Sequence, residues 1–427
     1  MENFEPNQNY QYIRERMKER PVNRKKLMRR SIITAMMAVI FGSLACFTFL
    51  LLEPVISNFL HPEEEPAPIE IPQEVEEMLP EDMLITEEPV SPPVVQQQEQ
   101  RPQLGVKDYE KLYNNIYDVA QETMKSVVTV TGISQDVDWF NNPYESTGQT
   151  SGLIIAESGR EWYILTDASV LTGVEDVNIT FSDGEVVAAT LKQQDKNTGL
   201  AIVTVALNDI PAETKSIAQV AKLGSSRPSS LLASQVIALG RPYGSTESVA
   251  YGMITSKGTA LNMADCNYEL ITTDIYGSEN ANGVLVNFSG EVIGIINQSY
   301  NRSEVKNLIS AVGITELKKT IERMSNGKEA AYLGIEGVDV TPDVNSELGV
   351  PMGAYVTGIA MYSPAMMVGI QSGDVIVKIN DTDISSFSKY TEVMMGFAPD
   401  DLITVVVKRQ GAGEYREIEI PVVLGKN

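Results

Sequence analysis

Histidine is almost absent from this chain, since its 427 residues contain a single one, His61. That residue lies in a stretch rich in Glu and Pro, a composition that does not support a folded core. A serine nucleophile ordinarily depends on a histidine base, and protein zinc sites draw on closely spaced His and Cys. The sequence therefore predicts neither a histidine-assisted nucleophile nor a metal site, and it indicates no cofactor.

Cysteine is equally scarce, with Cys46 in an apolar run and Cys266 in the part of the chain that should fold. Two residues so placed cannot form an internal disulfide, so the folded part must depend on its hydrophobic core. A surface protein without disulfides is more typical of the bacterial cell envelope than of an animal extracellular space. Without a histidine to activate it, Cys266 is predicted to be an ordinary buried thiol.

Charged residues are missing from Ser31 to Leu52, an apolar run of 22 residues. At about 1.5 Å per residue, a helix of this length spans a hydrocarbon core of roughly 30 Å. We expect one transmembrane helix over residues 31–52. A cleaved signal peptide is less favoured because its shorter apolar region should end in an Ala-x-Ala site. A lipid anchor on Cys46 is less favoured because apolar residues continue on both sides of it.

Lys and Arg are absent between this run and Arg101, whereas the N-terminal tail is rich in them. The basic residues before the run are Arg14, Arg16, Lys18, Arg20, Arg24, Lys25, Lys26, Arg29 and Arg30. By the positive-inside rule, residues 1–30 form a cytoplasmic tail and everything after Leu52 lies outside. Nucleic-acid binding is the less favoured reason for this charge, because the tail adjoins the membrane. We expect a single-pass protein of the bacterial cell membrane without a nucleic-acid partner.

Residues 53–104 carry many Glu and Pro residues, which contribute a large part of the net charge of -24. Such a segment buries too little apolar surface to offset chain entropy, and repulsion between its carboxylates extends it. We expect a disordered, solvated stalk. A specific acidic recognition site is the less favoured interpretation.

Short β-branched runs dominate the rest of the chain, after a helical pattern at residues 108–124. From residue 126 these runs are separated by Gly, Asn, Asp and Ser, which predicts a mainly β barrel or sandwich. A helical pattern, ITELKKTIERM, closes this part near Met324. A second set of strands follows Asn326 and Gly327, with a short helix expected at 389–395. We therefore expect two folded domains, residues 105–327 and 328–427.

Six collinear segments carry a resemblance to a known family. They are SGLIIAESGREWYILTDASVL, FSDGEVVAATLKQQDKNTGLAIVTV, VAKLGSSRPSSLLASQVIALGRPYG, GMITSKG, TTDIYGSENANGVLVNFSGEVIGI and SPAMMVGIQSGDVIVKIND. The chain resembles the HtrA (DegP-like) family of trypsin-fold serine proteases from about Ser126 to its end. The resemblance implies a trypsin-like double β-barrel at 105–327, followed by a PDZ domain at 328–427.

The positions that match the family's catalytic residues carry unreactive side chains. Ser169 in ILTDASV stands where the histidine base is expected, and Gly199 in TGLAI stands where the orienting aspartate is expected. In ENANGVL, Ala281 takes the place of the serine nucleophile. Glu279 replaces the glycine that begins the oxyanion hole, where a carboxylate opposes the developing negative charge. The resemblance thus predicts a degenerate catalytic triad, that is, a pseudoprotease.

The PDZ-like part keeps its expected binding loop, Tyr332, Leu333, Gly334 and Ile335. PDZ domains hold a ligand's C-terminal carboxylate on backbone N–H groups, while the peptide adds as a strand beside the domain's sheet. The resemblance predicts peptide binding at these four residues. The plainer alternative is that they only begin a buried strand.

The sequence favours a tethered, non-catalytic homologue that binds polypeptides or C-terminal peptides in envelope protein quality control or regulation. The resemblance further implies a homotrimer, or a mixed oligomer with an active relative. One alternative is an active serine endopeptidase with an unrecognised nucleophile such as Ser278 or Ser151. Another is a chaperone-like holdase that suppresses aggregation of unfolded clients without cleaving them.

Overall fold

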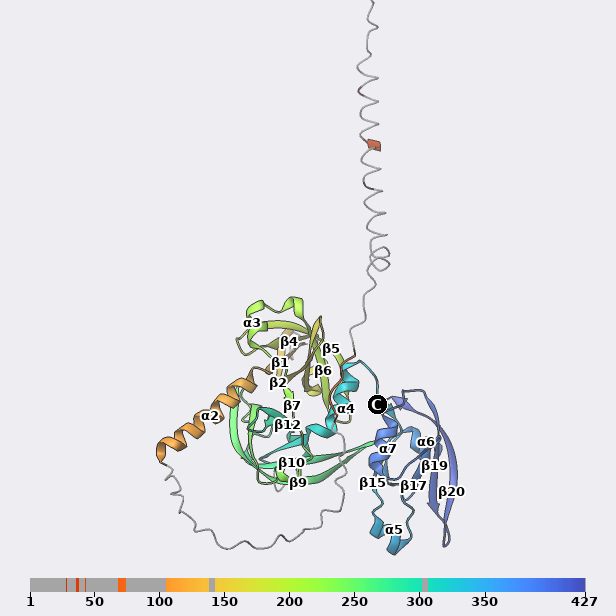
Figure 1. Ribbon diagram of the computed structural model, residues 1–427. Coiled ribbons are helices and arrows are strands. Elements are labelled where there is room, and N and C mark those ends of the chain that lie inside the picture. Colours follow the sequence, from red (N-terminus) through yellow and green to blue (C-terminus); the bar gives the residue numbers. More distant parts are fainter. Residues whose placement is uncertain are drawn as a thin grey trace, which may run out of the picture. The chain divides into compact units, whose positions relative to one another are not determined.

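The computed structural model describes residues 105–137, 143–301 and 306–426, together with 68–73 and Met28, Met36, Met37 and Ser43 (Figure 1). The chain divides into two units, residues 1–65 and 66–427. The predicted transmembrane helix at 31–52 lies outside the described residues, apart from Met36, Met37 and Ser43, which are helical. Within the described ranges, no helix is both long enough and apolar enough to cross a membrane.

The second unit begins its regular structure with helix α2, Val106–Met124, which confirms the helical pattern of the sequence. Its buried side chains include Ile116, Ala120 and Met124, which recur at helical spacing and pack on the core. On the same face, one to two turns nearer the N-terminus of the helix, Tyr109 and Tyr113 are exposed.

Six strands form a closed barrel in the order β1-β2-β3-β6-β5-β4. They are β1 Val127–Val137, β2 Pro143–Glu157, β3 Glu161–Asp167, β4 Asp176–Thr180, β5 Val186–Asp195 and β6 Leu200–Ala206. Strand β3 is buried on both faces: Trp162 and Ile164 enter the barrel core, while Tyr163 and Leu165 enter a second cluster. Because successive side chains of a strand point to opposite faces, its apolar run serves two cores.

A second barrel follows, with the strand order β11-β8-β9-β10-β13-β12-β7 and an additional β11–β12 pairing that closes it. Its strands are β7 Lys222–Leu223, β8 Gln235–Arg241, β9 Ser248–Met263, β10 Cys266–Tyr276, β11 Asn282–Val286, β12 Glu291–Asn297 and β13 Leu308–Gly313. Helix α4, Ile314–Ser325, follows β13, whereas helix α3, Ala212–Ile217, contacts the first barrel through the Thr214 hydroxyl, which donates to Asp183 Oδ2 at 2.6 Å. The short 3-10 turns of the two barrels are η1 Ala168–Leu171, η2 Leu207–Asp209, η3 Ser229–Leu231 and η4 Gln298–Tyr300. The predicted mainly β, trypsin-like double barrel is confirmed.

The C-terminal part folds around its own core, as expected for a PDZ domain. Its strands are β14 Ala331–Tyr332, β15 Ile335–Asp339, β16 Ala354–Ile359, β17 Val375–Ile379, β18 Thr382–Asp383, β19 Leu402–Gln410, β20 Tyr415–Val423 and β21 Gly425–Lys426. Its helices are α5 Pro342–Leu348, α6 Pro364–Val368 and α7 Phe387–Met394. The main sheet has the order β15-β16-β17-β19-β20, so β15 lies at its edge. Helix α7 begins two residues before the predicted 389–395, because the Ser386 hydroxyl caps it by accepting the Lys389 N–H at 3.0 Å.

Part of the predicted stalk is docked, which corrects the expectation that all of residues 53–104 is a solvated spacer. The Ile71 side chain is only 7% exposed and joins the core cluster that includes residues of α4. The Ile69 N–H donates to Asn326 Oδ1 at 2.9 Å, and Asn326 Nδ2 donates to the Ile69 carbonyl at 3.0 Å. Two isoleucines two residues apart thus hold residues 68–73 on the fold despite the acidic surroundings.

Candidate functional site

The loops that carry the three triad-matching positions meet at a narrow cavity of about 30 Å³. Asp167, Leu200 and Asn282 line it, and these residues lie next to or close to Ser169, Gly199 and Ala281 in the sequence. Such a volume holds on the order of one or two water molecules. The fold therefore brings together the segments on which a trypsin-like centre depends.

Ser169 lies in the turn η1, directly after strand β3, and its side chain is exposed. Its N–H donates to Asp167 Oδ1 at 2.8 Å, so Asp167 caps the turn. The neighbouring Ala168 N–H donates to the Gly199 carbonyl at 2.8 Å, which joins the base-position loop to the orienting-position loop. A hydroxyl at position 169 has no ionisation near neutral pH with which to accept and return a proton.

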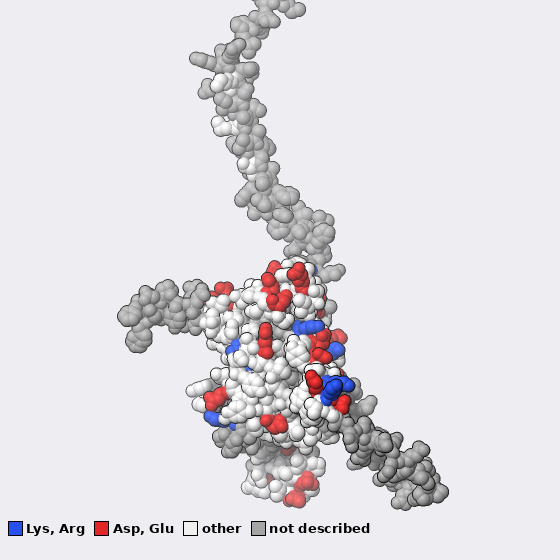
Figure 2. All heavy atoms as spheres, turned by 90° about the vertical axis from the view of Figure 1, so that its left-hand side faces the viewer, with Lys and Arg blue, Asp and Glu red and all other residues white. Residues whose placement is uncertain are grey.

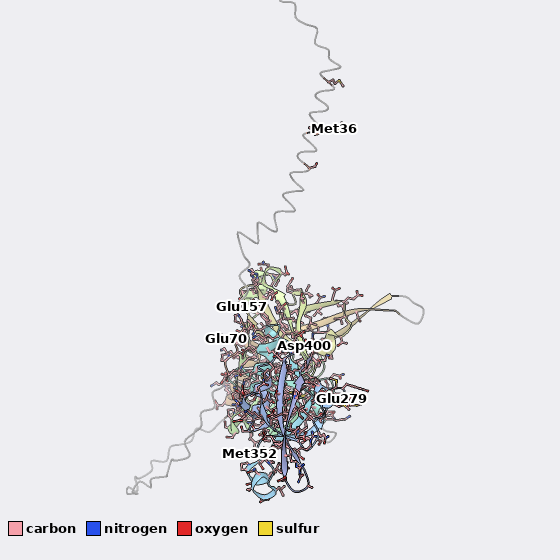
Figure 3. The ribbon with its side chains drawn as sticks, turned by 90° about the vertical axis from the view of Figure 1, so that its right-hand side faces the viewer. Met36, Glu70, Glu157, Glu279, Met352 and Asp400 are labelled. Carbon is pink, nitrogen blue, oxygen red and sulfur yellow. The ribbon has the colours of Figure 1, made fainter. Side chains whose placement is uncertain are left out.

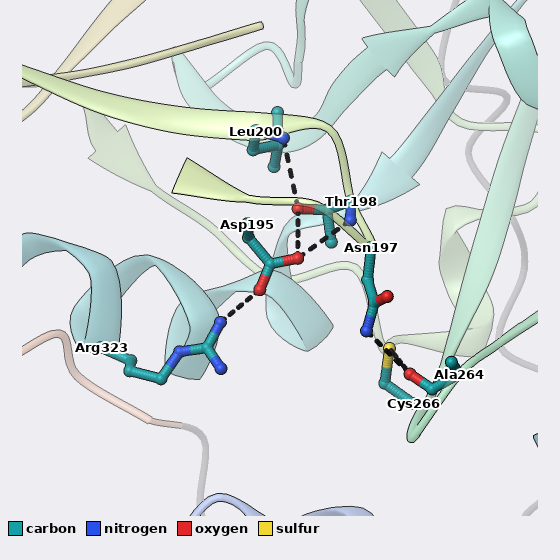
Figure 4. A network of polar contacts seen from close by, with 7 residues as sticks. All are labelled: Asp195, Asn197, Thr198, Leu200, Ala264, Cys266 and Arg323. Atoms are coloured by element: carbon teal, nitrogen blue, oxygen red, sulfur yellow. Dashed lines mark hydrogen bonds and ion pairs between the residues drawn. The ribbon is translucent and has the colours of Figure 1, made fainter. Parts of the chain in front are cut away.

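Gly199 occupies a tight turn between β5 and β6 with φ +67°, in the left-handed region that favours glycine. The turn is fixed by Asp195, whose Oδ1 accepts hydrogen bonds from the Thr198 N–H at 3.0 Å and the Thr198 hydroxyl at 3.1 Å. Its other oxygen pairs with Arg323 of α4 (Figure 4). The carboxylate of this turn thus serves the fold and does not reach position 169 in any described hydrogen bond.

Ala281 is only 4% exposed and belongs to the apolar cluster of the second barrel. Its N–H donates to the Ser278 carbonyl at 3.0 Å. The next residue, Asn282, reaches toward the first barrel, where its Oδ1 accepts the Ser151 N–H at 2.8 Å. The position expected to hold a nucleophile therefore presents a methyl group packed in the core.

Glu279 lies at the surface (Figure 3) and accepts a hydrogen bond from Lys306 Nζ at 2.8 Å. This bond and the charge of Lys306 lower the pKa of the Glu279 carboxyl, so it is ionised at neutral pH. Tyr243 and Tyr276 flank the pair, around an open hollow of about 410 Å³. The position predicted to begin the oxyanion loop therefore carries an ionised carboxylate that pairs with Lys306.

Neither of the two serines considered as replacement nucleophiles is hydrogen-bonded to a base in the described part of the chain. The Oγ atoms of Ser151 and Ser278 are both buried and have no hydrogen-bond partner in the described part of the chain. Cys266 is buried as predicted, and loss of solvation raises the pKa of its thiol to about 12. A thiol with so high a pKa is a poor nucleophile at neutral pH.

Among the residues that the structure describes, no group of three His, Cys, Asp or Glu side chains is arranged to hold a metal ion.

The predicted PDZ loop does form a nest of backbone donors. The N–H groups of Leu333 and Gly334 both donate to Asp265 Oδ2 at 2.8 Å, and the Ile335 N–H donates to Asp265 Oδ1 at 3.1 Å. Tyr332 pairs instead with Gly425 in the short β14–β21 ladder. Three of the four predicted residues therefore hold a carboxylate, which comes from the turn between β9 and β10.

Sequence reasoning missed both Asp265 and Tyr390, whose hydroxyl donates to Asp265 Oδ1 at 2.6 Å. The only signal for Asp265 is its place in MADC between two apolar runs, and aspartate is common in any turn.

On the face shown in Figure 2, acidic and basic side chains of the described residues are interspersed with uncharged ones and form no continuous basic patch.

Comparison with known proteins agrees with this architecture. A model of the trypsin-like peptidase domain matches residues 150–295, and a PDZ domain model matches residues 331–422. A DegP-like periplasmic serine endoprotease of Hahella chejuensis is 30% identical over 303 residues, which cover 67% of this chain and 60% of the relative. The chain is an HtrA/DegP-like homologue with a C-terminal PDZ domain.

Other relatives give the same result. The Do-like serine protease HtrB of Bacillus subtilis is 28% identical to this homologue, with 70% of this chain and 69% of the relative covered. The solved structure of the HtrA-type protease AlgW with a decapeptide has a TM-score of 0.50 at 22% identity, covering 74% of this chain and 98% of that one. This likeness shows the fold alone. The matched region spans less than two thirds of the Hahella relative and of a DegP-like relative from Halomonas elongata, at 60% and 56%.

Proposed function

We propose that this protein is a membrane-anchored, catalytically inactive HtrA homologue that binds polypeptide C-termini through its PDZ domain. The observation that carries the proposal is Ala281, a buried methyl group at the position that matches the serine nucleophile. Its role would be regulatory or protective in protein quality control of the bacterial cell envelope.

Loss of catalysis follows from the chemistry of acyl transfer. The reaction needs a nucleophile, a base that takes its proton, and donors for the oxyanion. Ala281 offers no nucleophile, Ser169 offers no base, and Glu279 adds negative charge at the oxyanion position. In serine proteases, removal of one member of the triad alone lowers kcat by about 10⁴-fold to 10⁶-fold. Several concurrent changes leave no route by which one residue could restore the reaction.

Membrane attachment rests on the uncharged run at residues 31–52 and the basic residues before it. A single helix there would leave residues 1–30 in the cytoplasm and both folded domains outside. The periplasmic DegP-like relative named above is consistent with folded domains outside the cytoplasm.

Oligomerisation is supported by an exposed aromatic surface. Tyr109 and Tyr113 of α2 lie 5.6 Å apart between ring centroids, Tyr113 lies 6.4 Å from Tyr251, and Tyr251 lies 5.9 Å from Phe288. All four rings are exposed in the single chain. Exposed aromatic clusters of this kind are typical of protein interfaces. A trimer of this chain, or a mixed trimer with an active relative, would cover them.

Hydrolysis and active-site labelling test the proposal directly. Full-length protein in detergent is incubated with unfolded casein and with a fluorophosphonate probe, and trypsin at equal concentration serves as the positive control. We expect no cleavage and no labelled serine, because Ala281 and Ser169 supply neither nucleophile nor base, and the Oγ atoms of Ser151 and Ser278 have no hydrogen-bond partner among the described residues. Cleavage together with labelling of Ser151, Ser278 or any other single serine would contradict the proposal and favour an active endopeptidase.

A further inference from the structure

The turn between β9 and β10 reaches from the second barrel into the PDZ domain. Met263 and Cys266 are paired, which leaves Ala264 and Asp265 as a two-residue turn. Asp265 has φ +63°, a conformation that aspartate tolerates better than most residues. Its side chain is only 8% exposed. A buried carboxylate at the tip of a hairpin needs partners, because desolvation of an unpaired charge is costly.

The partners of Asp265 are the donors that a PDZ domain offers to a peptide terminus. Leu333, Gly334 and Ile335 supply three backbone N–H groups, and Tyr390 of α7 supplies a hydroxyl. Successive N–H groups pointing into one concavity form an anion site, and such nests capture C-terminal carboxylates. The Asp265 carboxylate occupies the nest formed by residues 333–335.

The hairpin also mimics the backbone of a bound peptide. The Asp265 N–H donates to the Ile335 carbonyl at 2.7 Å, and Asn267 Nδ2 donates to the Gly337 carbonyl at 2.9 Å. Both acceptors lie on β15, the edge strand of the PDZ sheet. On the other side, the Thr391 hydroxyl of α7 donates to the Asp265 carbonyl at 3.2 Å. The tip therefore contacts both β15 and α7, which are the two walls of a strand-addition groove.

We propose that Asp265 is an internal ligand of the PDZ domain, and that a polypeptide C-terminus binds only by displacing the β9–β10 hairpin from the loop at 333–335. This inference rests on the proposed peptide-binding function and adds its regulation. A tethered ligand has a high effective concentration, so the fraction of domains with a free nest is small. Apparent affinity for an external peptide falls in proportion to that fraction.

The tip of the hairpin, Ala264 and Asp265, is also hydrogen-bonded to the turn between β5 and β6, next to the protease-like cleft. Asn197 Nδ2 donates to the Ala264 carbonyl at 2.8 Å, and Asn197 belongs to the turn that holds Gly199 (Figure 4). The same turn is anchored to α4 through the pair of Asp195 and Arg323. If the hairpin leaves the PDZ domain, the hydrogen bond from Asn197 to Ala264 breaks. Of these two contacts of the turn between β5 and β6, only the ion pair of Asp195 and Arg323 then remains. Peptide binding would therefore remove one of the contacts of the turn that carries Gly199.

The affinity for an added peptide measures the competition between that peptide and Asp265 for the loop at 333–335. The probe is a fluorescein-labelled decapeptide with an apolar C-terminal residue and a free carboxylate, because Ala331, Met394 and Phe397 are close to the tip. Its amidated twin is the ligand control. Fluorescence anisotropy is recorded with full-length protein in detergent, as wild type and as Asp265→Asn. The matched control variant is Glu269→Gln, which makes the same charge change at an exposed position of β10, the strand that follows Asp265.

We expect Asp265→Asn to bind the free-carboxylate peptide about tenfold or more tightly than wild type, with Glu269→Gln unchanged and the amidated peptide bound weakly. Equal affinity of wild type and Asp265→Asn would overturn the internal ligand while leaving PDZ peptide binding intact. Equal binding of the amidated and free peptides by Asp265→Asn would overturn carboxylate recognition by the loop, and the competition with it.

A second measurement, the alkylation rate of Cys266, tests the role of Asp265 even if no peptide binds. Cys266 adjoins Asp265 and is buried, so its alkylation by iodoacetamide, followed by mass spectrometry of the Cys266 peptide, reports release of the hairpin. We expect faster alkylation in Asp265→Asn than in wild type and Glu269→Gln. Unchanged alkylation in Asp265→Asn would overturn the role of Asp265. Faster alkylation without peptide binding would support it, and would contradict only the proposed binding of polypeptide C-termini.

Discussion

The protease-like cleft and the PDZ loop differ in the atoms on which their chemistry depends. At the cleft, a reaction would require the side chains of three residues, and the chain has Ser169, Gly199 and Ala281 there. At the loop, a carboxylate is held by backbone N–H groups of residues 333–335. Side-chain substitution can remove the first kind of site without disturbing the fold. The second kind persists through most substitutions, because every residue except proline keeps its N–H.

The glycines of the two regions sharpen this contrast. Gly334 has φ +85°, and a Cβ at this position would lie 2.3 Å from Ser363 Cβ. Gly199 also has a positive φ, +67°, but a Cβ there would have no heavy atom within 4 Å. The loop is therefore constrained by packing as well as by its backbone angles. The cleft position is constrained by its backbone angles alone.

The largest effect is expected from Gly334→Val. Valine cannot adopt φ +85° without strain, and its side chain collides with Ser363. Strain and overpacking together should lower the free energy of unfolding of the PDZ domain by roughly 2–6 kcal/mol. Chemical denaturation followed by circular dichroism measures the loss, and peptide binding should disappear.

Gly369→Val is the matched control, because Gly369 has φ +83° in the same domain and a Cβ there would have no heavy atom within 4 Å. Only the backbone strain remains, so a loss of about 1–2 kcal/mol is expected. If both variants lost the same stability, the close packing around Gly334 would have no energetic weight. The contrast between the two glycines would then fail.

The double barrel and the PDZ domain could be predicted because their strands are continuous apolar runs in a known order. The cleft could also be interpreted, since each of its positions lies in a recognisable segment such as ILTDASV or TGLAI. The docked segment at 68–73 was not predictable, because two isoleucines, Ile69 and Ile71, decide it within an acidic composition. Asp265 was missed because its partners lie 68 to 125 residues away in another domain, and no local pattern records such a contact.

A smaller effect is expected at Cys266, which directly follows Asp265 in the chain. Burial raises the pKa of its thiol to about 12, whereas an unfolded thiol titrates near about 8.5. Between these values the unfolded state has already lost the proton that the folded state keeps. The free energy of unfolding therefore falls as pH rises, by at most about 1.4 kcal/mol per pH unit from this group.

Urea unfolding of wild type and Cys266→Ala at pH 7, 8, 9 and 10 isolates this contribution. The two proteins should differ by a constant amount up to about pH 8. Above that, the stability of wild type should fall more steeply than that of Cys266→Ala. Parallel curves over the whole range would mean that the thiol is not held protonated by burial, and that the hairpin tip is open to solvent.

The smallest effect is expected from the pair of Glu279 and Lys306 at the entrance to the cleft. Both side chains are exposed, so solvent screens their attraction, and Lys306→Ala should leave the thermal midpoint unchanged within error. The variant should raise the pKa of Glu279, because the cation that lowers it is gone; carboxyl NMR titration measures this.

Glu279→Gly removes the negative charge from the oxyanion position and restores the glycine that the family has there. It should still give no fluorophosphonate labelling, because Ala281 supplies no nucleophile and Ser169 supplies no base. Labelling of this variant would show that the charge of Glu279 alone had silenced a serine elsewhere in the cleft. The cleft would then be a suppressed active site, and its difference from the PDZ loop would be one of charge.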